Sequence, residues 1–122
     1  MKGLNVYGKF LRKLRVDNNE NMKDMAEKLN VSVSYLSAVE LGKREIPAIW
    51  NETIIREYKL DKTSSTDLQN AFESSINELR INLNELDIFE RNIVASFARK
   101  VTLFNIDDFK EFEAILRKKG DD

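Results

Sequence analysis

The chain has 122 residues, 42% of them hydrophobic and 34% charged, a balance that fits one globular domain or a small domain with an appendage. It contains no Cys and no His, which excludes disulfides, His/Cys zinc sites and nucleophiles activated by an imidazole. The net charge is −1, but residues 1–60 hold 11 basic and 8 acidic side chains whereas residues 61–122 hold 9 and 13, so we expect the first half to meet an anion.

Gly and Pro are sparse, with four and one respectively, and this predicts a chain that is mainly all-α. A first helix is expected over "VYGKFLRKLRVDN", where apolar residues recur at helical spacing: Tyr7, Leu11 and Leu14. Asn21 is the predicted N-cap of a second helix, and Asp24 completes an acidic variant of the capping box. The inner face of this second helix consists of Met25, Ala26 and Leu29.

A third helix is expected to follow Ser32, its predicted N-cap, with Leu36 and Val39 facing inward. Gly42 is expected to end it, since glycine adopts the left-handed conformation of a helix C-terminus readily. Pro47 then precedes a fourth helix, whose apolar side comprises Trp50, Ile54, Ile55 and Tyr58.

The polar, Ser/Thr-rich stretch "DKTSSTD" lies between two helical patterns and predicts a linker over residues 62–67. We therefore expect a first domain over 1–61 and a C-terminal region over 68–122.

The C-terminal region contains "ELRINLNEL", which alternates apolar and polar residues. This alternation predicts a short strand over 78–83, although a helix continuing through it fits as well. Asp87 with Glu90 predicts a capped helix after it. A last helix is expected to follow an N-cap at Asn105 or Asp107.

Residues 22–41 read as two short helices that share one core. Their inner positions are apolar at the required spacing, namely Met25, Leu29, Val31, Leu36 and Val39. Ala26 supplies the small side chain needed where two helices cross closely, and Asn30 tolerates the left-handed backbone of a tight turn. Together these positions predict a helix-turn-helix.

The stretch "SVSYLSAVELGKREIP" resembles the second motif helix and following Gly-Lys-Arg turn of the Cro/lambda-repressor-like (XRE-type) helix-turn-helix family. "YGKFLRKLR" and "NMKDMAEKL" resemble the two preceding helices, so the resemblance covers about residues 4–60. The remainder, including "SFARKV", is similar to the tails of short phage and mobile-element regulators. The resemblance implies a lambda-repressor-like bundle that binds double-stranded DNA.

By this resemblance the helix after Ser32 enters the major groove, and its outward residues contact bases: Val33, Ser34, Ser37 and Ala38. The residues implied at the DNA backbone are Asn21, Lys23, Ser32, Tyr35, Lys43 and Arg44. Residues 33–39 carry no charge in a chain that is about one-third charged, which favours a groove-facing surface over an ordinary solvated one.

Two further positions follow from the family pattern. Met22 stands where the family often has Gln contacting phosphate, so one hydrogen bond to DNA is expected to be absent. Arg15 and Glu40 occupy the positions of a structural ion pair between the first helix and the end of the third.

The sequence thus predicts a sequence-specific transcription regulator, a repressor, that binds a palindromic operator as a homodimer in the cytoplasm. The C-terminal region would provide the dimer interface through Phe72, Ile76, Ile81, Phe97, Phe109 and Phe112. No cleft motif, Gly-rich phosphate loop or ligand cluster predicts an enzyme, a metal or a cofactor, and no apolar run predicts a membrane segment or a signal peptide.

An alternative hypothesis is a protein-binding module that keeps the helix-turn-helix shape. Its acidic second half would bind a basic partner, as an antitoxin, an anti-repressor or an inhibitor of a host nucleic-acid-binding protein does. The two hypotheses are compatible, because one chain could regulate its own operon and bind a second protein.

Overall fold

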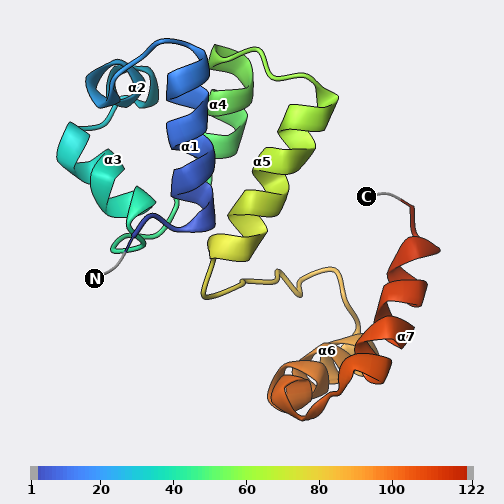
Figure 1. Cartoon of the computed structure of the whole chain (residues 1–122). Coiled ribbons are helices and arrows are strands. Elements are labelled where there is room, and N and C mark those ends of the chain that lie inside the picture. The colour runs from blue at the N-terminus through green and yellow to red at the C-terminus, as the bar shows by residue number, and fades with distance from the viewer. Residues whose placement is uncertain (1–2, 121–122) are drawn as a thin grey trace. The chain divides into compact units, whose positions relative to one another are not determined.

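The computed structural model describes residues 3–120 and divides them into an N-terminal unit, residues 3–79, and a C-terminal unit, residues 80–120 (Figure 1). The N-terminal unit contains α1 (Val6–Asp17), α2 (Met22–Leu29), α3 (Val33–Glu40), α4 (Trp50–Glu57) and α5 (Lys62–Ser75). The C-terminal unit contains α6 (Ile88–Lys100), the 3-10 turn η1 (Val101–Leu103) and α7 (Ile106–Arg117). Residues 3–120 contain helices and no strand, so the all-α prediction is confirmed. None of these helices is long and apolar enough to cross a membrane.

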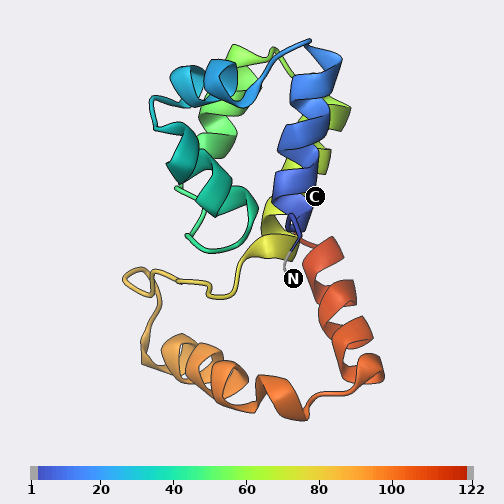
Figure 2. The same cartoon turned by 60° about the vertical axis from the view of Figure 1, so that its left-hand side comes forward.

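One hydrophobic core holds the five helices of the N-terminal unit together. Its buried apolar side chains are Tyr7, Leu11, Met25, Ala26, Leu29, Leu36, Val39, Trp50, Ile54, Leu68 and Ala71. Every one of the five helices contributes to this set, and α1 lies at its centre with α3 and α5 packed against it (Figures 1 and 2). Burial of these side chains is the main source of the unit's stability.

Glu20, in the loop between α1 and α2, connects this loop to the end of α4 and to α2 through polar contacts. The Tyr58 hydroxyl donates to the Glu20 carboxylate at 2.5 Å, and the Lys28 ammonium lies 2.5 Å from the other carboxylate oxygen. Lys28 also lies 4.3 Å from the centroid of the Tyr58 ring. Burial, reinforced by the hydrogen bond to Glu20, raises the pKa of Tyr58, so its hydroxyl remains a donor even in alkaline solution. These contacts fix the position of α2 on the bundle.

The linker predicted over 62–67 is wrong, because these residues form the first turns of α5. The Asp61 side chain accepts a hydrogen bond from the Ser64 amide at 2.8 Å and caps the helix. Leu68 and Ala71 then fall on one face, which is buried against the core. The structure places the division of the chain after Leu79, so the N-terminal unit is longer than the predicted domain over 1–61.

The strand considered over 78–83 is also absent, and so is the alternative of a continuing helix, because residues 76–87 form an irregular connection. A strand requires a partner for its backbone groups, and the described residues offer none. The predicted capping box of Asp87 and Glu90 is present. Asn105, with Asp108, caps α7, which resolves the choice between Asn105 and Asp107.

Candidate nucleic-acid interface

The connection between α2 and α3 has the geometry of a helix-turn-helix. Asn21 and Asp24 form the predicted capping box at the start of α2, and Asn30 ends that helix with φ at 59°, in the left-handed region. Ser32 then caps α3 by accepting from the Tyr35 amide at 3.1 Å. Ala26, only 2% exposed, lies in the shared core, as the spacing predicted. Three short-range signals therefore determine this turn.

α3 approaches α1 so closely that a side chain at Gly8 would not fit. A Cβ atom added there would lie 2.5 Å from the Glu40 carbonyl oxygen. The Asn5 amide donates to that same oxygen at 2.9 Å, and the Asn5 side chain donates to the Val39 carbonyl at 3.2 Å. The sequence reasoning missed both residues. A glycine inside a helix is costly, so Gly8 was itself a signal of close backbone approach.

Arg15 and Glu40 form a buried ion pair between α1 and the end of α3. The two guanidinium nitrogens of Arg15 donate to the two carboxylate oxygens at 2.5 and 3.2 Å. The side chains are 8% and 2% exposed. Both carboxylate oxygens are hydrogen-bonded, and leaving either charge unpaired at this depth would have a large cost in free energy. The pair therefore fixes the orientation of α3 relative to α1.

The four residues predicted to contact bases lie together on the outer side of α3. Val33 and Ser34 are exposed, whereas Ser37 and Ala38 are half-buried. None of the four belongs to the core, whose α3 members are Leu36 and Val39 on the opposite side. The surface is small, uncharged and accessible, so side chains of a partner can reach it.

The turn after α3 folds back onto the helix and presents two cations. Gly42 adopts a φ of 77°, and the amides of Lys43 and Arg44 both donate to the Ala38 carbonyl, at 2.8 and 3.3 Å. Both basic side chains are exposed. The Arg44 guanidinium lies 5.0 Å from the centroid of the Tyr35 ring, a cation–π contact that positions it beside α3.

Tyr35 packs its ring edge against Trp50 of α4, with 6.1 Å between the ring centroids. It is half-buried and therefore connects the core to the Gly42 turn. The ring supports Arg44, and the contact of Tyr35 with the DNA backbone stays a prediction.

The start of α2 is arranged less favourably for an anion. Asn21 and Lys23 are exposed, but the Asn21 side chain accepts from the Asp24 amide at 2.9 Å, and the Asp24 carboxylate accepts from the Asn21 amide at 2.9 Å. A negative charge thus occupies the first turn. Met22 packs partly buried against the core, which accounts for an apolar residue where the family often has Gln.

The residues predicted to form a dimer interface belong to two different units and have different environments. Phe72 is partly buried against the core of the N-terminal unit, in an edge-to-face contact with Tyr7 in which the ring centroids lie 6.3 Å apart, and Ile76 is half-buried. Phe72 therefore has a structural role, because α5 belongs to the bundle. Ile81 is exposed on the irregular connection, and Phe97, Phe109 and Phe112 belong to an aromatic cluster in the C-terminal unit.

Five packed helices, with a left-handed turn between α2 and α3 and an accessible α3, define the class of helix-turn-helix DNA-binding domains. Residues 11–48, from α1 to the loop before α4, match the family model described as Helix-turn-helix. Residues 11–48 therefore form a helix-turn-helix domain of the Cro/lambda-repressor-like (XRE) type, which supports a role in DNA-binding transcription regulation. Comparisons with curated proteins and with solved structures gave no match.

Proposed function

We propose that this regulator is a repressor that binds a palindromic operator as a homodimer, with α3 in the major groove. The observation that carries the proposal is the pairing of an uncharged, accessible α3 surface with exposed cations at Lys43 and Arg44. The buried Arg15–Glu40 pair and the tight Gly8 contact hold this surface at a fixed angle. Recognition of a DNA groove requires a helix held in a fixed orientation with phosphate-binding side chains beside it.

The chemistry of the four outer side chains suggests how bases are read. Val33 and Ala38 offer methyl groups to the thymine methyl, and the hydroxyls of Ser34 and Ser37 can donate to or accept from base edges. No Arg, Asn or Gln lies among residues 33–39, so bidentate recognition of guanine or adenine by this helix is excluded. Base discrimination is therefore modest, and the shape of the operator contributes to specificity.

A homodimer follows from the small size of this interface. One short recognition helix makes few base contacts, and two copies related by a two-fold axis read two half-sites about 34 Å apart. Repression is favoured over activation because bound protein alone can exclude polymerase from a promoter, whereas activation needs a dedicated contact surface. The protein acts on DNA in the cytoplasm.

Footprinting on DNA upstream of the protein's own gene tests this function. We expect one protected region with two-fold sequence symmetry and half-site centres about one helical turn apart. Protection confined to a single asymmetric site would contradict the homodimer, and no protection at low salt on any segment of the upstream DNA would contradict DNA regulation by this surface.

Replacing Lys43 and Arg44 together by alanine is expected to weaken DNA binding strongly and to reduce its salt dependence. Each lost phosphate contact lowers the slope of log affinity against log salt by about one, so a dimer would lose about four. Titration by fluorescence anisotropy at several salt concentrations measures this slope.

A matched control removes the same charge elsewhere in the N-terminal unit. Arg56 at the end of α4 and Lys62 at the start of α5 are both exposed and do not lie on α3 or its turn. Their double alanine variant should keep the slope of the unchanged protein. Equal effects of the two double variants would mean that only net charge matters and that the Gly42 turn makes no specific contact.

Replacing Ser34 and Ser37 by alanine is expected to reduce specificity more than affinity. Loss of two hydroxyls that bond base edges should lower the ratio of operator binding to binding of unrelated DNA by about tenfold or more, at about 1 kcal/mol or more per contact. Competition titrations with operator and random duplexes measure the ratio. An unchanged ratio would show that neither serine reads a base.

The alternative function, a protein-binding module, is favoured by the many exposed apolar side chains of the C-terminal unit. This alternative makes a different prediction for the double alanine variant at Lys43 and Arg44. If alanine at Lys43 and Arg44 left cellular activity intact while abolishing DNA retention, the activity would depend on a protein partner rather than on an operator.

A further inference from the structure

The C-terminal unit has no core of its own. None of the described residues 80–120 is buried, although α6 and α7 carry many large apolar side chains. The chain contains no Cys, and residues 3–120 hold no cluster of side chains suited to a metal ion. Units of about 40 residues usually need disulfides, a metal or oligomerisation to be stable, so association is the remaining source of stability here.

Four phenylalanine rings join α6 to α7 and form an incomplete core. Phe104 lies 5.3 Å from Phe97 and 5.1 Å from Phe112 by ring centroid, and Phe109 lies 5.8 Å from Phe112. Phe97 and Phe109 are still 40% and 41% exposed. The cluster therefore holds the two helices together on one side and remains open to solvent on the other.

An apolar stripe continues this open surface along α6. Phe89, Ile93 and Phe97 follow one another at steps of four residues on one face of α6, and Val101 continues the series at the start of η1. Phe89 is 72% exposed and Ile93 is 56% exposed. On α7, Leu116 lies one turn beyond Phe112 and is also exposed. Such a continuous apolar surface is expected to be covered by a protein partner.

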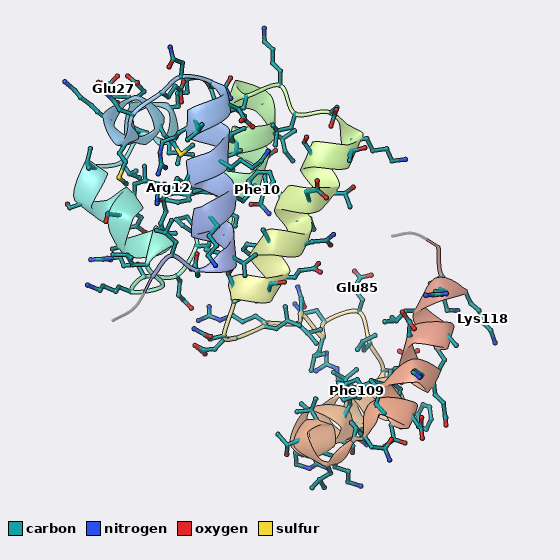
Figure 3. The ribbon with its side chains drawn as sticks, viewed as in Figure 1. Phe10, Arg12, Glu27, Glu85, Phe109 and Lys118 are labelled. Atoms are coloured by element: carbon teal, nitrogen blue, oxygen red, sulfur yellow. The ribbon has the colours of Figure 1, made fainter. Side chains whose placement is uncertain are left out.

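Charge along the two helices indicates which partner covers it. α6 begins with Asp87 and Glu90 and ends with Arg99 and Lys100. α7 likewise begins with acidic residues, Asp107 and Asp108, and ends in the basic run 117–119. Figure 3 shows Phe109 near the start of α7 and Lys118 at its far end.

Two copies of such a polarised helix attract each other when they run antiparallel, because each acidic start then meets a basic end. Residues 80–122 hold eight basic and nine acidic side chains, so the unit as a whole does not select a strongly charged partner. A second copy satisfies both the apolar surface and the charge pattern.

We propose that α6, η1 and α7 pair with the same elements of a second copy, with α7 antiparallel to its partner, and that the aromatic core is completed only in this dimer. The proposal rests on the homodimer proposed for DNA binding and assigns its interface to the stripe Phe89–Ile93–Phe97–Val101 and the Phe cluster. Folding of the C-terminal unit is then coupled to association.

The first test uses Ile93→Glu in the full chain. Sedimentation equilibrium over about a hundredfold range of concentration should show a dimer for the unchanged protein and a dissociation constant raised about a hundredfold or more for the variant. Val16→Glu is the matched control, because Val16 is also an exposed apolar residue (70%, against 56% for Ile93) but lies on α1, and it should leave the constant unchanged.

The fluorescence of Trp50 separates the C-terminal unit from the N-terminal one. Trp50 is the only tryptophan and lies in the N-terminal core, so its emission should be the same in Ile93→Glu and in the unchanged protein. A chain that stays monomeric at every concentration, or an Ile93→Glu variant that dimerises normally, overturns the proposed interface. The footprint on the upstream DNA measures DNA binding separately, so protection could still be observed if the proposed interface were wrong.

A second test addresses the antiparallel arrangement. Chains carrying Arg117→Glu with Lys118→Glu, and chains carrying Asp107→Lys with Asp108→Lys, should each dimerise weakly alone because like charges meet. Mixing them should restore association, since each reversed end then meets an opposite charge. Unimpaired dimers of either variant alone, or a mixture no stronger than its components, overturn the antiparallel charge pairing.

Discussion

Replacing Arg15 by leucine is expected to lower the free energy of unfolding of the N-terminal unit by about 3 to 5 kcal/mol. The substitution leaves the Glu40 carboxylate buried without its partner, and Arg15 is the cation that pairs with it among residues 3–120. The loss is therefore that of an uncompensated charge rather than that of one contact. Urea denaturation followed by Trp50 fluorescence measures it.

The double variant Arg15→Leu with Glu40→Leu distinguishes this mechanism from simple loss of packing. Removing both charges should recover much of the lost stability, because the cost lies in the unpaired carboxylate. DNA binding should not recover with it, since the bidentate pair also determines the angle of α3. A double variant as unstable as the single one would show that packing around Arg15, including its contact with the Met25 sulfur, dominates.

Lys13→Leu provides the comparison with an exposed pair. Lys13 lies 3.4 Å from Asp17 one turn later on α1, but both side chains are largely exposed. Solvent screens this pair, and the expected change in the free energy of unfolding is about 0.5 kcal/mol or less. The contrast between the two substitutions isolates burial as the cause.

The residues from Asn21 to Gly42 could be predicted from the sequence because their structure depends on near neighbours. The Asn21–Asp24 box, the left-handed turn at Asn30 and the cap at Ser32 each involve side chains within three residues of the backbone they satisfy. Local chemistry of this kind leaves a direct trace in the amino-acid pattern. The candidate base-contacting residues were then placed on the third helix by the resemblance to the family.

The misread segments depended on partners distant in the sequence. Ser and Thr near residues 62–67 suit a polar linker and the first turn of a helix equally well. Only the packing of α5 against α1 decides between the two. The Tyr7 amide donates to Ser75 of α5 at 2.9 Å, across 68 positions, and no local pattern announces such a contact. In the same way, the alternation over 78–83 could become a strand only beside another strand.

The sequence reasoning grouped Phe72 with the apolar residues of the C-terminal unit for a related reason. Phe72 and Phe112 look alike in a list of apolar residues, yet the first is partly buried in the N-terminal bundle and the second belongs to an open aromatic cluster. Hydrophobicity indicates that a side chain needs cover but does not say whether its own domain or another molecule provides it.

Ending the chain at residue 61 is expected to abolish cooperative folding, whereas ending it at residue 79 should leave a stable N-terminal unit. The shorter chain lacks α5 and exposes the side of the core that Leu68 and Ala71 cover. It also loses the hydrogen bonds from the Tyr7 amide to the Ser75 hydroxyl at 2.9 Å and from the Asn51 side chain to Gln69 at 3.2 Å. Together these losses are about 5 kcal/mol or more, which is comparable to the whole stability of a small domain.

Thermal melting followed by circular dichroism compares the two chains, and two substitutions in the longer one locate the cause. Leu68→Ala should lower the free energy of unfolding by about 2 to 5 kcal/mol because it leaves a cavity beside α1. Asn70→Ala, exposed on the same helix, should change it little and controls for helix propensity. A chain of residues 1–61 that melts as sharply as residues 1–79 would mean that α1 to α4 form a complete core and that α5 is an accessory. The Tyr7 and Leu11 side chains, both fully buried with α5 present, argue against that outcome, since their cover cannot come from solvent.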